Sequence, residues 1–115
     1  MSWPARIVLL LVAGLHLWFL VLEMFLWTTP TGRRAFGLTP ENAATTKTLA
    51  ANQGLYNGFL VAGLAWAAIA NRRDIAIFFL VCVVVAGAYG AITVNRRIAL
   101  VQAFPALIGL LLVVA

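Results

Sequence analysis

The stretch IVLLLVAGLHLWFLVLEMFLW, residues 7–27, decides the class of fold. It is a continuous apolar run that only one histidine and one glutamate interrupt. A transmembrane helix needs about 20 apolar residues, whereas a signal peptide has a shorter apolar core that a cleavage site of small residues follows. No such site follows this longer run. We therefore expect residues 7–27 to form a helix that crosses a membrane.

The rest of the chain has the same character. Hydrophobic residues make up 64% of the 115 residues and charged residues only 10%, whereas a soluble domain carries about 25% charged residues to cover its surface. Short polar turns separate further apolar runs, so that the predicted spans are residues 7–27, 49–70, 75–94 and 98–115. Short connections make consecutive helices antiparallel neighbours. The sequence predicts an all-α, integral membrane up-down-up-down four-helix bundle, with a single transmembrane domain over residues 1–115.

Turn and capping residues set the expected ends of these helices. Residues 28–32 contain a proline and a glycine and are expected to end the first helix. Thr39 as a cap, Pro40 in the first turn and Glu41 beside the positive helix end together indicate a helix start. Residues 40–48 are too polar for lipid, so we expect an extramembrane helical segment there that leads into the second span.

Basic residues give the chain a formal net charge of +5. They cluster as arginine pairs at residues 33–34, 72–73 and 96–97, in turns where charges set the topology of a membrane protein. Arginines without a soluble face around them cannot form a groove for DNA. The expected partner is therefore the lipid bilayer and not nucleic acid. The positive-inside rule places the first and third loops in the cytoplasm, by a margin of about one charge.

Polar side chains recur at one depth of the predicted bundle. An ionisable residue within a span is costly and indicates function by default. His16 and Glu23 lie almost two helical turns apart and so share a face of the first span. Each predicted span carries a polar side chain at a similar depth, near the membrane face on which the first and third loops lie. This suggests a polar pocket that opens to that face, with arginines of the loops at its rim. The predicted ligand-binding residues are Glu23, His16, Gln53, Asn57, Tyr89, Gln102, Arg33, Arg34 and Arg96.

A structural interpretation explains the same residues. Arginines of the loops would be ion partners of Glu23, and the amides would join helices by hydrogen bonds. The sequence has no metal-binding cluster, no phosphate loop and no Ser-His-acid set. A single histidine also excludes a haem held between two histidines. We therefore predict no catalytic residue, no metal site and no cofactor.

Several sequence runs carry a resemblance to a known family. They are HLWFLVLEMFLWTTP at residues 16–30, AANQGLYNGFL at 50–60, Gly32-Arg33, Phe36-Gly37-Leu38, Gly87-x-Tyr89-Gly90 and Val101-Gln102-x-x-Pro105-Ala106. Together they resemble the bacterial membrane family catalogued as domain of unknown function 1304, along nearly the whole chain. The resemblance implies a four-span membrane protein but no assigned activity. The expected location is the bacterial inner (cytoplasmic) membrane, with multiple passes.

Three functions are compatible with the sequence. The first is binding or proton-coupled transport of a small molecule or lipid, with Glu23 as the titrating group. Small multidrug-resistance transporters have a similar size and layout, though not these motifs, and work as dimers, so a homodimer is a further expectation. The second function is an accessory or structural subunit of a larger membrane complex. The third is a membrane-embedded lipid or quinone enzyme with Glu23 or His16 as general base. One acid with amide neighbours provides few groups for catalysis, so this function ranks last.

Overall fold

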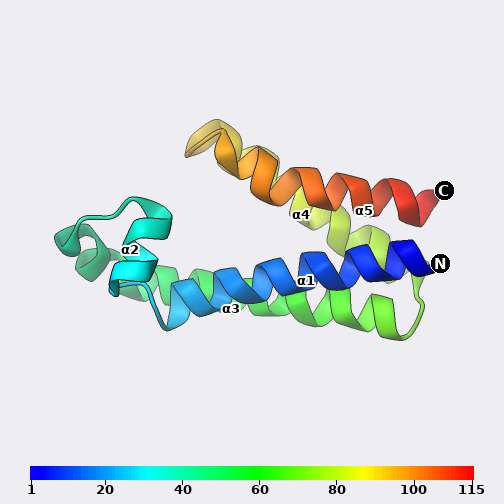
Figure 1. The fold of residues 1–115 in the computed structure, drawn as a ribbon, viewed down its shortest axis with the longest axis horizontal. Coiled ribbons are helices and arrows are strands. Elements are labelled where there is room, and N and C mark those ends of the chain that lie inside the picture. Colours follow the sequence, from blue (N-terminus) through cyan, green and yellow to red (C-terminus); the bar gives the residue numbers. More distant parts are fainter. The chain divides into compact units, whose positions relative to one another are not determined.

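The computed structural model describes all 115 residues, and they form helices without any strand (Figure 1). In chain order these are α1 (Trp3–Met24), α2 (Pro30–Phe36), α3 (Pro40–Ile69), α4 (Arg73–Thr93), the π-helix η1 (Ala99–Ala103) and α5 (Phe104–Val114). The prediction of an all-α chain is confirmed. The chain divides into two compact units, a terminal unit of Met1–Ala13 with Leu60–Ala115 and a central unit of Gly14–Phe59. The prediction of a single transmembrane domain over residues 1–115 stays a prediction.

Two of the helices are long and apolar enough to cross a membrane. They are α1 and α4, whereas the apolar stretch Ala99–Val114 is shorter. α3 is the longest helix, but it contains the amides Asn52, Gln53 and Asn57, which lower its mean hydropathy. Two of the four predicted spans therefore meet this test of length and composition.

α1 begins and ends earlier than the predicted span over residues 7–27. At its start Ser2 Oγ accepts the N–H of Ala5 at 3.2 Å, and Pro4 fits the first turn because it has no N–H to leave unpaired. Beyond its end, the N–H of Thr29 and the Thr29 hydroxyl both donate to the carbonyl of Leu26, at 3.1 and 2.6 Å. These bonds span three residues and replace the four-residue hydrogen bonds of the α-helix, so the chain turns here.

A short helix, α2, follows where the sequence predicted only a helix-ending turn over residues 28–32. Thr29 has an extended backbone, and its side chain accepts the N–H of Gly32 at 3.3 Å, which caps the helix. Pro30 occupies the first helical position, where it is tolerated. Gly37, in the left-handed conformation with a φ of 64°, ends α2. The turn residues thus end one helix and start another.

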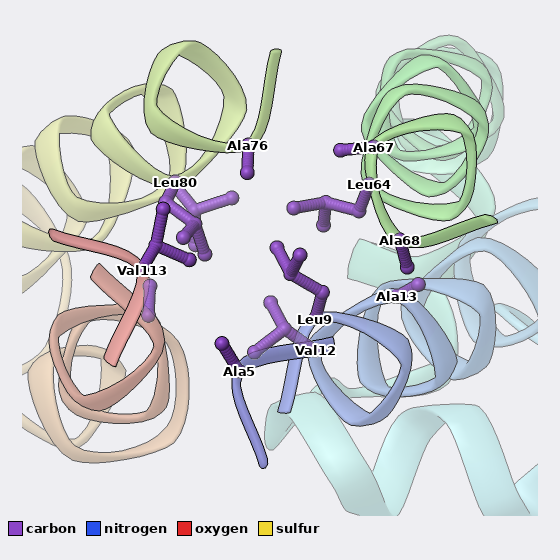
Figure 2. Close-up of a cluster of buried hydrophobic side chains, with 12 residues drawn as sticks. Ala5, Leu9, Val12, Ala13, Leu64, Ala67, Ala68, Ala76, Leu80 and Val113 are labelled. Carbon is purple, nitrogen blue, oxygen red and sulfur yellow. The ribbon is translucent and has the colours of Figure 1, made fainter. Parts of the chain in front are cut away.

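The core of the terminal unit is built from small and branched apolar side chains. Figure 2 shows side chains of α1, α3, α4 and α5 pointing toward one another. Leu9, Leu64 and Leu80 are completely excluded from the surface. Also buried in this cluster are Ala5, Val12, Ala13, Ala67, Ala68, Ala76, Val83, Ala106 and Val113.

The turn between α3 and α4 lies at one end of this core. Arg6 Nε donates to the carbonyl of Ala68 at 2.8 Å, which satisfies an acceptor at the end of α3. Asn71 turns the chain with a φ of 54°. Hydrogen bonds donated to Asp74 at 3.0 and 2.8 Å raise the pKa of the exposed Arg72 guanidinium. The polar turn predicted over residues 71–74 is shorter in the structure, because α4 already begins at Arg73.

The last apolar run is not one regular α-helix, as the predicted span over residues 98–115 implied. η1 precedes α5, and the N–H of Phe104 donates to the carbonyl of Ala99, five residues back. Pro105 is the physical cause, because it has no N–H for an α-helical bond to Val101 and its ring would clash with that carbonyl. The wider turn packs against α4, where a Cβ added at Gly87 would lie 2.8 Å from the backbone nitrogen of Ala103.

Candidate functional site

The centre of the candidate site is a carboxylate–amide pair within the central unit. Glu23 lies in the last turn of α1 and is only 4% exposed. Asn57 Nδ2, from α3, donates a hydrogen bond to Glu23 Oε1. The two residues are distant in sequence, so the antiparallel course of α1 and α3 is what brings them together. The structure thus joins two of the residues that the sequence analysis selected by depth.

Small residues of α3 allow this close approach. A Cβ at Gly54 would lie 2.5 Å from Met24 Cγ and 3.2 Å from Glu23 Cβ. One turn further on, a Cβ at Gly58 would lie 3.1 Å from Leu20 Cδ1. Glycines spaced four residues apart on one helix face let helix backbones approach closely. They therefore set the distance at which the short Asn57 side chain reaches the carboxylate of α1.

His16 lies on the same helix as Glu23, two turns earlier. Its side chain is completely buried. The imidazole ring meets the ring of Phe19 edge-on, with centroids 5.3 Å apart. A second ionisable group is thus enclosed on α1.

The other predicted residue of α3 has a different environment. Gln53 is exposed, although its spacing from Asn57 predicted that the two amides would share a face. A spacing of four residues rotates a side chain by about 40° around the helix axis, and the neighbouring Gly54 and Asn57 take the positions against α1. Gln53 therefore lies beside the contact and not within it.

The arginines of the α1–α3 connection do not neutralise Glu23. Arg34 is exposed and Arg33 is half-buried, and no ion pair joins either of them to Glu23. The Nε atom of Arg33 is buried and has no hydrogen-bond partner. The hydrogen bond to Glu23 comes instead from the neutral Asn57 amide. The structural alternative made Arg33 or Arg34 the ion partner of Glu23. The central unit contains no such ion pair.

The remaining predicted residues belong to the terminal unit. Tyr89 is 70% exposed near the end of α4, and its carbonyl accepts the Thr93 hydroxyl at 2.7 Å. Gln102 is half-buried within η1, and Arg96 is exposed in the turn after α4. The hypothesis that these three residues share a pocket with Glu23 stays a prediction.

Sequence reasoning missed the aromatic cluster around α2. The Trp27 and Phe36 rings lie 4.7 Å apart, and Trp27 Nε1 donates to Thr46 Oγ1 at 3.0 Å. The signal that could have found α2 is Thr29 followed by Pro30, a capping residue before a proline at the first helical position. No group of three or more His, Cys, Asp or Glu side chains is placed to hold a metal ion.

The fold defines an all-helical protein with two helices able to cross a membrane. The chain belongs to the family described as protein of unknown function (DUF1304), whose model matches residues 10–114. It is 31% identical over 106 residues to the uncharacterised protein YpaA of Lactococcus lactis, which covers 89% of each chain. The resemblance carried by the sequence runs is therefore confirmed. No solved structure matches the chain.

Proposed function

We propose that this chain is a four-span protein of the bacterial inner membrane. Only 33% of the apolar 18-residue segment of α1 and 22% of that of α4 are buried. The core helix of a soluble protein is mostly buried. Large exposed apolar surfaces in water cause association, and lipid is the solvent that suits them. In this proposal α3 and the stretch Ala99–Val114 supply the other two spans. With 30 residues, α3 has a length of about 45 Å at a rise of 1.5 Å per residue, more than the hydrocarbon core requires.

The proposed function is binding or transport of a small molecule or lipid, with Glu23 as the titrating group. The observation that carries the proposal is the hydrogen bond between the buried Glu23 of α1 and the half-buried Asn57 of α3. A carboxylate within a membrane span is costly. The Asn57 amide supplies a hydrogen bond but no positive charge. A proton or a cationic ligand is therefore the partner that suits an ionised Glu23.

The proposed pocket lies near one membrane face, on the side of the α1–α3 connection. Asn57 would orient the ligand together with Gln53, Tyr89 and Gln102. His16 lies deeper along α1 and would serve as a second protonatable group. The arginines at positions 33, 34 and 96 would attract anionic groups to the rim.

A ligand screen on matched variants tests this function. Purified protein would be screened by thermal shift against organic cations, organic anions and neutral lipids, beginning with tetraphenylphosphonium. We expect a compound that stabilises the native chain and Glu41→Gln but not Glu23→Gln, because Glu41 is an exposed acid outside the pair. In proteoliposomes the same compound should drive a change of internal pH with the native chain and with Glu41→Gln, but not with Glu23→Gln. Equal stabilisation and proton flux with Glu23→Gln, or no stabilising compound, would overturn the proposal.

A further inference from the structure

The connection between α1 and α3, together with the first turns of α3, is basic. The exposed or half-buried charged side chains of the central unit are Arg33, Arg34, Lys47 and Glu41. The remaining acid, Glu23, is buried against Asn57. We call Arg33, Arg34 and Lys47 the basic cluster. Its three positive charges exceed the one exposed negative charge, so this part of the chain suits an anionic partner.

Arg33 is the member of the cluster whose side chain has a buried hydrogen-bond donor without a partner. Its Nε atom is buried without a partner, although the residue is only half-buried. Leaving a buried donor unpaired costs free energy, and such groups are rare in folded proteins. A small rotation of the flexible side chain would bring the Nε–H edge to the surface, where an outside acceptor could satisfy it. A phosphate matches this edge, because arginine binds phosphate through paired N–H groups.

Local contacts anchor the backbone around Arg33. Thr29 caps α2, and a Cβ at Gly32 would lie 1.9 Å from the carbonyl oxygen of Leu26, so the chain is tightly folded there. Trp27 contacts the Phe36 ring and donates to Thr46 of α3. Arg33 therefore starts from a preorganised helix, so little further ordering of the backbone is needed to bind a ligand.

The aromatic residues identify the environment. Trp27 is half-buried, and Phe36, in the same short helix as Arg33 and Arg34, is 41% exposed. Tryptophan and tyrosine are enriched at the membrane–water interface, where their rings lie at the level of the headgroups, and loops next to the membrane carry an excess of Lys and Arg on the cytoplasmic side. An anionic phospholipid presents its phosphate at this level. Membrane surfaces rich in such lipids attract clusters of basic residues.

We propose that the basic cluster binds the phosphate of an anionic phospholipid, with Arg33 Nε–H as the specific donor. Arg34 and Lys47 add attraction without fixed geometry, since both side chains are exposed. This lipid site is separate from the Glu23–Asn57 pair. It rests on the proposed function for the location of the chain in a membrane, and it shares Arg33 and Arg34 with the rim of the proposed pocket.

Native mass spectrometry of the purified chain with equal amounts of phosphatidylglycerol and phosphatidylcholine tests the lipid site. The native chain should retain phosphatidylglycerol preferentially. Arg33→Gln should weaken the first bound phosphatidylglycerol about tenfold, because it removes a charge-assisted hydrogen bond. Arg34→Gln, with the same loss of charge at an exposed position, should change binding less than about twofold. Glu23→Gln should leave the preference unchanged, which separates this result from the proposed function.

Further arms of the experiment identify the donor and the source of the phosphate. Arg33→Lys keeps the positive charge but lacks the Nε–H fork, so it should recover only part of the preference. Thermal unfolding of each variant shows whether it is folded. If Arg33→Gln does not fold, Arg33→Lys takes its place in the comparison with Arg34→Gln. Equal losses in Arg33→Gln and Arg34→Gln, or full recovery with lysine, would overturn the proposal. Displacement of the lipid by millimolar inorganic phosphate would equally overturn it.

Discussion

At the scale of single residues, the hydrogen bond from Asn57 to Glu23 is the feature with the clearest energetic consequence. Asn57→Ala leaves a buried carboxylate without its amide donor. We expect a loss of about 1–3 kcal/mol in the free energy of unfolding. Asn52→Ala is the matched control, because it removes an exposed amide from the same helix and should change stability by less than about 0.5 kcal/mol. Denaturant unfolding in detergent measures both, and equal losses would contradict the role assigned to Asn57.

A second residue-scale prediction concerns the tight start of α2. Gly32→Ala should destabilise the chain by more than about 1 kcal/mol, since the new Cβ would lie 1.9 Å from a backbone oxygen that cannot move freely. Gly14→Ala meets nothing within 4 Å, and within a helix it should be neutral or stabilising. Thermal unfolding of the two variants makes the comparison. Tolerance of alanine at position 32 would mean that the connection is looser than described.

At the scale of helices, the contact between α4 and η1 predicts that Gly87 cannot be replaced. An added Cβ would lie 2.8 Å from the backbone nitrogen of Ala103, so the two helices would have to separate. Gly58→Ala meets only the end of the flexible Leu20 side chain, at 3.1 Å. We therefore expect a lower unfolding temperature for Gly87→Ala than for Gly58→Ala. The reverse order would show that η1 does not pack on α4 through Gly87.

The helices also show what sequence can and cannot predict. The start of α3 and the turn before α4 follow from Thr39-Pro40 and from a short polar segment, which are local signals. α2 was missed because Pro30 was interpreted only as the end of the preceding helix, although it also suits the first turn of a new one. η1 was missed because it lies within a continuous apolar run, where hydrophobicity does not report the local widening that Pro105 causes.

At the scale of the whole molecule, the number of membrane crossings is the open prediction. In a Cys82→Ala background, single cysteines at the exposed positions 34, 73 and 95 would be labelled with a membrane-impermeant maleimide. Four spans place positions 34 and 95 on one side and position 73 on the other. Two spans, α1 and α4 alone, would place positions 34 and 73 together and position 95 opposite. Labelling in intact and in permeabilised vesicles distinguishes the two patterns.

The candidate site was predictable in part. The common depth expected for antiparallel helices selected Glu23 and Asn57, and the structure joins them by a hydrogen bond. Gln53 was assigned to the same face from its spacing, but it is exposed, because Gly54 takes the position against α1. The common depth that groups Tyr89 and Gln102 with Glu23 depends on the arrangement of all helices in a bilayer, which the order of residues along the chain does not specify.

The central claim is that Glu23 and Asn57 form part of a ligand site, and an experimental structure of the protein in lipid nanodiscs tests it most directly. The sample would contain the compound that stabilises the native chain but not Glu23→Gln. We predict ordered non-protein density in contact with both side chains. A dry pair, with the two side chains bonded only to each other and the compound bound elsewhere or absent, would contradict the claim and assign the pair to helix packing.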